Sequence, residues 1–328
     1  MTTKPERNLA MELIRVTEAA ALASARWMGR GNKEGSDKAA VDAMRLMLNS
    51  IHMDGVVAIG EGEKDEAPML YNGEHLGTGE PPRVDIAVDP IDGTRLLSLG
   101  RSGSLSVVAL SERGTMYRPE KIVYMDKIAV GPECKGVTDI EAPVIHNLKA
   151  IAKATGKDLD DLTIVVLDRP RHEELIAEIR AAGARIKLIG DGDISGGLIA
   201  ATEGTGMDAL MGVGGSPEAV ITACALKCIG GDMQCKLYPR NEEERQWALD
   251  NGRDLDKVLT IDDLVAGDNV FFAATGITDG ELLKGVRYFG KGAKTSSLSM
   301  RSKSGTLREI EATHRWDKLM KISQIRFD

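Results

Sequence analysis

Two carboxylates lie within one hexapeptide, Asp89-Pro-Ile-Asp-Gly-Thr94, directly after the apolar run at 84–88. A proline that ends a strand and a glycine that permits a tight turn can aim both acids at one point. Carboxylate, carbonyl and hydroxyl oxygens are the ligands that Mg²⁺ and Mn²⁺ prefer. We interpret the segment as a metal site, with Thr94 at a helix start that favours an anion. The alternative is a capped turn in which Asp92 or Thr94 only satisfies backbone N–H groups.

Two further acidic segments follow apolar runs in the same way. Glu61-Gly-Glu63 comes after residues 55–60, and Ser216-Pro-Glu218 comes after the glycines at 212, 214 and 215. Ser216 suits a helix N-cap, Pro217 the first helical position and Glu218 the first turn, where the helix dipole stabilises a carboxylate. A solvated loop and a simple helix start are the plainer interpretations. Several strand ends that each present carboxylates nevertheless favour one shared metal site.

Cationic and polar residues mark another two predicted strand ends. Arg169-Pro170-Arg171 follows the run at 163–167, and guanidinium groups bind two phosphate oxygens at once. The same charges could simply cap a helix that starts at His172. Asp191-Gly192-Asp193 could accept hydrogen bonds from sugar hydroxyls or form an Asx turn. Lys33 lies between glycines and ahead of Asp37.

These residues require strands and helices in alternation to bring them together. Apolar periodicity predicts an amphipathic helix through Leu13 and Trp27, a second helix from Ser36, a third over 172–182 and a fourth containing Cys224 and Cys228. We expect strands at 55–60, 84–88, 105–110, 122–130, 163–167, 185–189, 207–211 and 270–274, and an alternating strand region at 297–310. The pattern predicts a layered α/β or α+β fold. We expect a lobe over 1–140 and a lobe over 141–328, which share one metal-binding cleft as a continuous catalytic unit.

Composition excludes several classes of protein. The 328 residues include 42 Lys and Arg against 50 Asp and Glu, a net charge of −8 that argues against nucleic-acid binding. No apolar stretch approaches the ~20 residues that span a bilayer, and no signal peptide is recognisable, so we expect a cytoplasmic protein. The four cysteines form no zinc pattern, and we expect buried, reduced thiols at Cys224 and Cys228. The glycines at 212–215 do not complete a dinucleotide-binding fingerprint.

An ordered set of motifs resembles class II fructose-1,6-bisphosphatase, within the lithium-sensitive, metal-dependent sugar and inositol phosphatase superfamily. The segment 88–94 resembles the superfamily signature. The more specific motifs lie at 29–33, 59–71, 127–132, 191–193 and 214–218, and the match runs in order over roughly residues 8 to 315.

The resemblance implies an α/β/α/β/α sandwich and hydrolysis of the 1-phosphate of D-fructose 1,6-bisphosphate to fructose 6-phosphate, a step of gluconeogenesis. It implies two or three Mg²⁺ or Mn²⁺ ions on Asp37, Glu61, Asp89, Asp92 and Glu218. The implied substrate contacts are Asp92, Gly93, Thr94, Tyr124, Arg169, Pro170, Arg171, Asp191, Gly192, Asp193 and Gly215. Thr94 and Glu61 are expected to orient the attacking water, and Lys33 to stabilise phosphoryl charge. A homo-oligomer, a dimer or a tetramer, is also expected.

Three alternatives stay open. Activity on sedoheptulose 1,7-bisphosphate is compatible with every motif. A phosphatase for inositol or nucleotide phosphates would not need arginines for a distal phosphate. A non-catalytic, sugar-phosphate-binding regulator would typically have lost a metal carboxylate, yet all five are present. One departure from the family pattern is Asn32, where many members carry Asp, and it could alter metal dependence.

Overall fold

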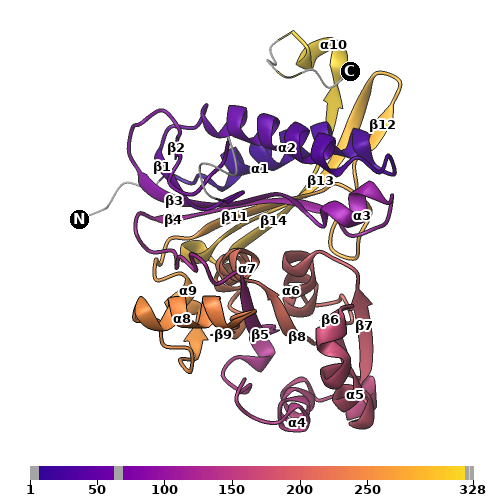
Figure 1. Cartoon of the computed structure of the whole chain (residues 1–328). Helices are drawn as coiled ribbons and strands as arrows, with labels where there is room; N and C mark the ends of the chain where they lie inside the picture. The colour runs from indigo at the N-terminus through magenta and orange to yellow at the C-terminus, as the bar shows by residue number, and fades with distance from the viewer. Residues whose placement is uncertain (1–6, 63–68, 322–324, 326–328) are drawn as a thin grey trace, which may run out of the picture.

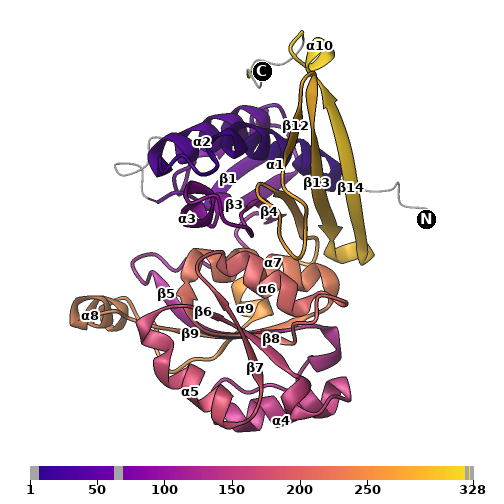
Figure 2. The ribbon, with the colours of Figure 1, turned by 90° about the vertical axis from the view of Figure 1, so that its right-hand side faces the viewer.

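Two β-sheets alternate with layers of helices (Figures 1 and 2). The computed structural model describes residues 7–62, 69–321 and 325. Helices α1 (Ala10–Ser24) and α2 (Lys33–Leu48) cover the outer face of the first sheet, and α6 (Asp193–Ala201) and α7 (Ser216–Ile229) lie between the sheets. Helices α4 (Val144–Thr155) and α5 (Glu173–Ala181) cover the far face of the second sheet. This confirms the predicted mixed α/β class, whereas the superfamily assignment of the sandwich stays a prediction.

The first sheet is mixed and draws on both ends of the chain. Its order is β12 (Arg287–Phe289), β13 (Gly292–Arg301), β11 (Phe271–Gly276), β4 (Leu105–Glu112), β3 (Arg83–Asp92), β1 (Asp54–Ile59) and β2 (His75–Leu76), and β14 (Thr306–Arg315) also pairs with β13. Strands β1 and β3 run parallel, and β3 and β4 run antiparallel. The carboxyl end of β3 therefore lies in the interior of the sheet.

The second sheet uses the middle of the chain. Its order is β10 (Leu259–Thr260), β9 (Asp232–Leu237), β5 (Tyr124–Val130), β8 (Ala209–Gly215), β6 (Thr163–Leu167) and β7 (Arg185–Ile189). Strands β6, β7 and β8 run parallel to one another, so their carboxyl ends share one edge. The predicted division of the chain into two lobes at residue 140 stays a prediction. The two sheets do not follow that boundary, because the strands after residue 270 belong to the first sheet.

The remaining helices are short and lie around these layers. They are α3 (Thr94–Ser98), α8 (Glu242–Asp250), α9 (Ile261–Leu264) and α10 (Trp316–Leu319), with 3₁₀ turns at Ala25–Trp27, Pro132–Cys134, Leu159–Asp161, Pro170–His172 and Ser302–Ser304. The most extensive apolar cluster joins both sheets through α6 and α7, with Phe272 of β11, Leu210 of β8 and Leu226 of α7 all buried in it. This shared core fixes the two sheets relative to each other.

Two expected strand boundaries were wrong. Strand β3 does not stop at Asp89-Pro90 but continues to Asp92, because Pro90 occupies an irregularity where the pairing shifts from Asp89–Val107 to Asp92–Leu105. The strand expected at 207–211 instead runs from Ala209 to Gly215 as β8, with Gly212 at a φ of +115°. The strand region expected at 297–310 is confirmed. It divides into β13 and β14, which form a hairpin whose turn has Gly305 in the left-handed region.

Candidate functional site

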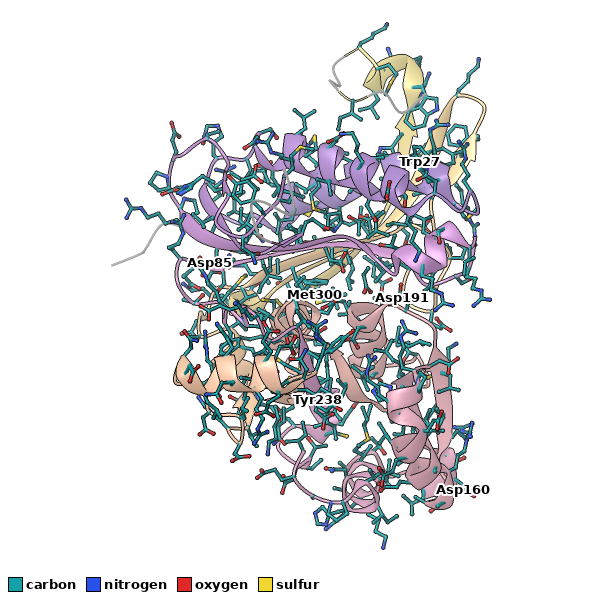
Figure 3. All side chains as sticks on the ribbon, in the orientation of Figure 1. Trp27, Asp85, Asp160, Asp191, Tyr238 and Met300 are labelled. Carbon is teal, nitrogen blue, oxygen red and sulfur yellow. The ribbon has the colours of Figure 1, made fainter. Side chains whose placement is uncertain are left out.

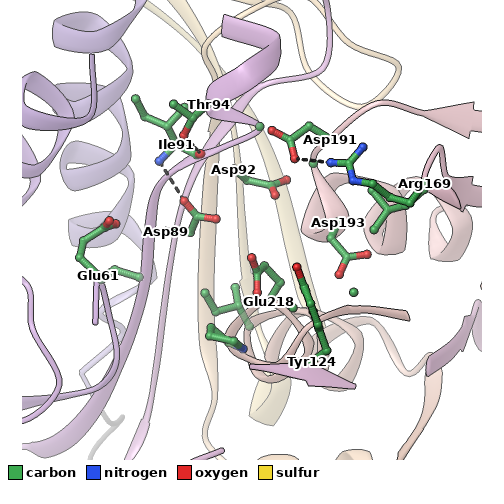
Figure 4. Close-up of a pocket in the computed structure, with 18 of the residues that line it drawn as sticks. Glu61, Asp89, Ile91, Asp92, Thr94, Tyr124, Arg169, Asp191, Asp193 and Glu218 are labelled. Atoms are coloured by element: carbon green, nitrogen blue, oxygen red, sulfur yellow. Dashed lines mark hydrogen bonds and ion pairs between the residues drawn. The ribbon is translucent and has the colours of Figure 1, made fainter. Parts of the chain in front are cut away.

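A cavity of about 410 Å³ opens between the two sheets (Figure 4). The first sheet contributes the ends of β1 and β3, and the second contributes the ends of β5, β6, β7 and β8. Of the residues predicted from the sequence, the lining includes Glu61, Asp89, Asp92, Gly93, Thr94, Tyr124, Arg169, Arg171, Asp191, Gly192, Asp193, Gly215 and Glu218. Acids and arginines that are far apart in the chain therefore face one another across a single cleft.

Two Asp-Gly turns meet in this cleft and cap each other's helices. Gly93 starts α3 and Gly192 starts α6, with φ angles of +87° and +86° that favour glycine. Asp92, from the first turn, accepts a hydrogen bond from the backbone N–H of Ser195 in α6 at 2.8 Å. Asp191, from the second turn, accepts one from the N–H of Arg95 in α3 at 3.2 Å. These two hydrogen bonds connect the first sheet to the second within the cleft.

The pKa values of several acids of the cleft are raised above their ordinary values. Burial raises the pKa of Asp89 and of Asp92 well above the ordinary range, and nearby carboxylates add to both shifts. Burial also raises the pKa of Glu218, against the opposing charge of Lys127. The pKa of Glu61 rises to about 7 through desolvation and then through the charges of Asp37 and Glu218, although water screens part of the effect because its side chain is open to the cleft.

One buried carboxylate oxygen of the cleft, Glu218 Oε2, has no hydrogen-bond partner among the described residues. A buried unpaired acceptor costs free energy, and a cation would compensate it. Together with Asp89 and Asp92 it forms an all-oxygen donor set, which fits Mg²⁺ or Mn²⁺ and not softer ions.

Gly214 and Gly215 leave the space that two carboxylates occupy close to the backbone. A Cβ on Gly214 would lie 2.0 Å from Asp193 Oδ2, and a Cβ on Gly215 would lie 1.8 Å from Glu218 Oε2. The predicted N-cap role of Ser216 was wrong: Gly215 is the N-cap of α7, and Ser216 Oγ is buried without a partner among the described atoms.

The cations of the cleft are held by backbone carbonyls. Arg169 donates to the Gly190 carbonyl at 2.8 Å and pairs with Asp191 at 3.5 Å. Arg171 donates from Nε and Nη2 to the Val213 carbonyl at 3.1 and 2.8 Å, and its guanidinium lies 4.8 Å from the centre of the Tyr124 ring. Both arginines are thus fixed with donors left over for a ligand.

Three predicted residues are not part of the cavity lining. Asp37, in α2, accepts a hydrogen bond from Thr94 Oγ1 at 3.1 Å and so lies directly behind the lining. Burial raises the pKa of Asp37, while Thr94 and Lys33 oppose that rise. Lys33 is the first residue of α2 and is exposed, and Pro170 is exposed in the 3₁₀ turn. Asn32 caps α2 by accepting from the Gly35 N–H at 2.8 Å. Glu63 lies outside the described residues.

Another acidic group lies far from the cleft. Asp158, Asp160 and Asp161 have carboxylate oxygens within 4.8 Å of one another, and all three side chains are exposed. Figure 3 shows Asp160 at the opposite end of the second sheet from Asp191, which lies between the two sheets. Within the described residues, no three acids of the cleft have carboxylate oxygens that all lie within 4.8 Å of one another.

Two residues of the site were missed by sequence reasoning. Lys127 of β5 donates to the Asp193 carboxylate. It is the first residue of the motif at 127–132, but sequence reasoning gave it no role. His172 accepts from the Val213 N–H at Nε2, at 2.8 Å, and its Nδ1 lies 2.7 Å from the Leu167 carbonyl. Burial lowers the pKa of His172, so the neutral ring supports the strand that carries the glycine pair.

The thiols take no part in the site. Cys134, Cys224, Cys228 and Cys235 are free and buried, which confirms the prediction for Cys224 and Cys228. Burial raises the pKa of Cys235 and of Cys228 to about 12, so neither ionises near neutral pH.

Comparison with known proteins identifies relatives over nearly the whole chain. A family model described as bacterial fructose-1,6-bisphosphatase, glpX-encoded, matches residues 7–314. A class 2 fructose-1,6-bisphosphatase of Haemophilus influenzae is 46% identical over 332 residues, covering 97% of this chain and 99% of the relative. A Synechococcus protein named D-fructose 1,6-bisphosphatase class 2/sedoheptulose 1,7-bisphosphatase is 46% identical over 338 residues, covering 95% of this chain and 97% of the relative.

In the described part of the chain, no helix combines the length and apolar character needed to cross a membrane.

Proposed function

The chain belongs to the family of glpX-encoded, class 2 bacterial fructose-1,6-bisphosphatases, and we propose that its cleft performs the reaction with divalent metal ions held by its carboxylates. The enzyme hydrolyses D-fructose 1,6-bisphosphate to fructose 6-phosphate and phosphate. The observation that supports the assignment to this cleft is that Glu61 and Asp89 lie at one end of the cavity, whereas Arg169 lies at the other end beside Asp191. A sugar with a phosphate at each end requires both.

The metal-binding residues would be Asp37, Glu61, Asp89, Asp92 and Glu218, supported by the unpartnered Glu218 Oε2 and the all-oxygen donor set. Bound Mg²⁺ or Mn²⁺ supplies charge neutralisation at the phosphoryl oxygens and a water of lowered pKa. Positioning and electrostatic stabilisation dominate catalysis of phosphoryl transfer. The carboxylates would therefore contribute mainly by holding the metal ions in place.

The remaining residues bind and orient the reactants. Thr94 Oγ1, held by Asp37 and by the Ile91 carbonyl at 3.1 Å each, is placed to orient the attacking water. Glu61 lines the same cavity, and its carboxylate would help Thr94 to orient this water by accepting a hydrogen bond from it. Lys33 opposes negative charge next to Asp37, and we propose that it also stabilises the phosphoryl group.

The distal half of the cleft would bind the sugar and its second phosphate. Asp193 and Asp191 accept hydrogen bonds from hydroxyls, and Arg169, Arg171 and Tyr124 bind the distal phosphate. The bifunctional names of the Synechococcus relatives favour sedoheptulose 1,7-bisphosphate as a second substrate. We further propose a homo-oligomer, which light scattering after size exclusion measures directly.

The test is phosphate release from fructose 1,6-bisphosphate, sedoheptulose 1,7-bisphosphate and inositol 1-phosphate, each with Mg²⁺, with Mn²⁺ and with EDTA. We expect turnover of the first substrate, loss of turnover with EDTA and no activity on inositol 1-phosphate. Preferential hydrolysis of inositol 1-phosphate would contradict the assignment.

A matched pair of variants locates the reaction in the cleft. Asp89→Asn keeps the shape of the side chain and removes a metal-binding charge, so we expect kcat to fall by at least about a hundredfold. Asp160→Asn makes the same change in the exposed cluster outside the cleft and should leave kcat and KM unchanged. Near-normal turnover by Asp89→Asn would place the metal site elsewhere.

A further inference from the structure

Lys127 is a buried charge that the mechanism above does not use. It lies in β5, between Gly212 of β8 and Cys235 of β9, and is only 2% exposed. An isolated ammonium group buried to this extent would be strongly destabilising, so it must be paired and hydrogen-bonded. The groups that pair with Lys127 therefore indicate its role.

The ammonium group joins the two helix starts that face the cavity. Lys127 Nζ donates to the carboxylate of Asp193, the first residue of α6, and to the carbonyl of Gly215 at 2.9 Å, the residue before α7. The charges of Asp193 and Glu218 raise the pKa of Lys127 despite its burial, so the side chain stays cationic. Both helices are thereby anchored to the central strand of the second sheet.

Asp193 has little freedom to move between these contacts. Gly214 lies against one side of its carboxylate, where even a Cβ would come within 2.0 Å of Oδ2, and Lys127 holds it from within the sheet. The same carboxylate lines the cavity. Lys127 itself is not part of that lining, so it acts on a ligand only through what it holds.

We propose that Lys127 is a positioning residue that sets the orientation of Asp193 toward the sugar hydroxyls of the substrate. This inference rests on the proposed function, in which Asp193 binds the sugar. Buried ion pairs add little stability compared with well-packed apolar residues, so stability alone does not explain a lysine here. A misplaced Asp193 weakens contacts made equally in the ground state and in the transition state, which raises KM and changes kcat little.

Lys127→Met removes the charge and keeps most of the volume. We expect KM for fructose 1,6-bisphosphate to rise about tenfold or more, with kcat within about threefold of wild type. Lys157→Met is the matched control, because Lys157 also pairs with a buried acid of the second sheet, Asp208, at 2.6 Å, but outside the cleft. That control should leave both constants unchanged. An unchanged KM in folded Lys127→Met would overturn the proposal.

A double-mutant cycle separates positioning from folding. If Lys127→Met unfolds because Asp193 is left unpaired, Lys127→Met with Asp193→Asn should fold, since both buried charges are gone. We expect the double variant to raise KM only as much as Asp193→Asn alone. Multiplied effects would show that Lys127 does not act through Asp193 and would overturn the proposal. Failure of the proposed function is distinct, because wild-type enzyme would then release no phosphate from fructose 1,6-bisphosphate.

Discussion

At the scale of single residues, the acids of the cleft compete for protons and for metal. Desolvation and mutual repulsion raise the pKa values of Asp89, Asp92 and Glu218, and Glu61 reaches about 7. Each carboxyl must lose its proton before it binds a cation. The charges that make the site a good cation site therefore also make it sensitive to pH.

This competition predicts that metal affinity rises with pH. Between pH 6 and about 7.5 the protonated fraction of Glu61 falls, so the half-saturating Mg²⁺ concentration should drop and then level off. Calorimetric titration with Mg²⁺ in two buffers of different ionisation enthalpy measures the affinity and the protons released. Glu61→Gln serves as the control, because it should flatten the dependence near pH 7. Equal affinity and no proton release at pH 6 and pH 8 would contradict the proposed ligand set.

The same pKa shifts determine how the stability of the metal-free enzyme changes with pH. A carboxyl whose folded pKa is raised binds more protons in the folded state than in the unfolded state. The free energy of unfolding therefore falls as pH rises from about 4.5, the unfolded value for Glu61, to about 7, its folded value. Metal binding reverses this loss, because the cation stabilises the ionised form.

At the scale of elements, junctions between strands and helices carry the site. Asp92 and Asp191 cap each other's helices, and His172 and Arg171 hold the N–H and the carbonyl of Val213. Each junction is thus fixed by an element of another part of the chain. Rigid elements hold a site more accurately than free loops do.

The junction of β8 with α7 predicts a steric effect on metal binding. Gly215→Ala adds a Cβ that would lie 1.8 Å from Glu218 Oε2, so the carboxylate must swing away from the cleft. We expect the half-saturating Mg²⁺ concentration to rise at least about tenfold, and the thermal midpoint to change little, because the displaced group is a side chain. Gly290→Ala is the matched control, since no atom lies within 4 Å of its added Cβ. Equal metal affinity in the two variants would contradict the placement of Glu218.

Sequence patterns predicted most elements but not how they join. Apolar periodicity located α1, β1, β4, β6 and β11, because local burial dictates it. It missed the passage of β3 through Pro90, the strand at 212–215 and the split of β13 from β14, because register and bulges depend on partner strands far away in the chain. Strand ends correctly indicated Glu61, Asp89 and Arg169 as members of one cleft. The role of Lys127 was missed, although the motif at 127–132 includes it, because a lone charge in a strand does not indicate its partner.

At the scale of the whole molecule, the cleft lies between the two sheets and is lined by residues from both. The first sheet contributes Glu61, Asp89 and Asp92. The strands of the second sheet lead into the arginines, the Asp191–Asp193 turn and Glu218, and α6 and α7 pack between the sheets. A substrate with a phosphate at each end would contact both sheets at once. Strands β11, β13 and β14 come after residue 270, so the first sheet is completed by a part of the chain that follows the whole second sheet.

This arrangement predicts that ligands of the cleft stabilise the entire fold. A ligand that binds only the folded state adds about 2.7 kcal/mol at a hundred times its Kd, which shifts the midpoint of a chain of this size by about 4 °C. Mg²⁺ with fructose 6-phosphate should therefore raise the unfolding temperature in a single transition, more than either ligand alone, because together they bridge the two sheets. Differential scanning calorimetry with and without EDTA measures this. Asp89→Asn should lose the metal-dependent part of the shift, and Asp160→Asn should retain it. Two separate transitions, with only one of them moved by the ligands, would show that the sheets unfold independently and that the cleft does not couple them.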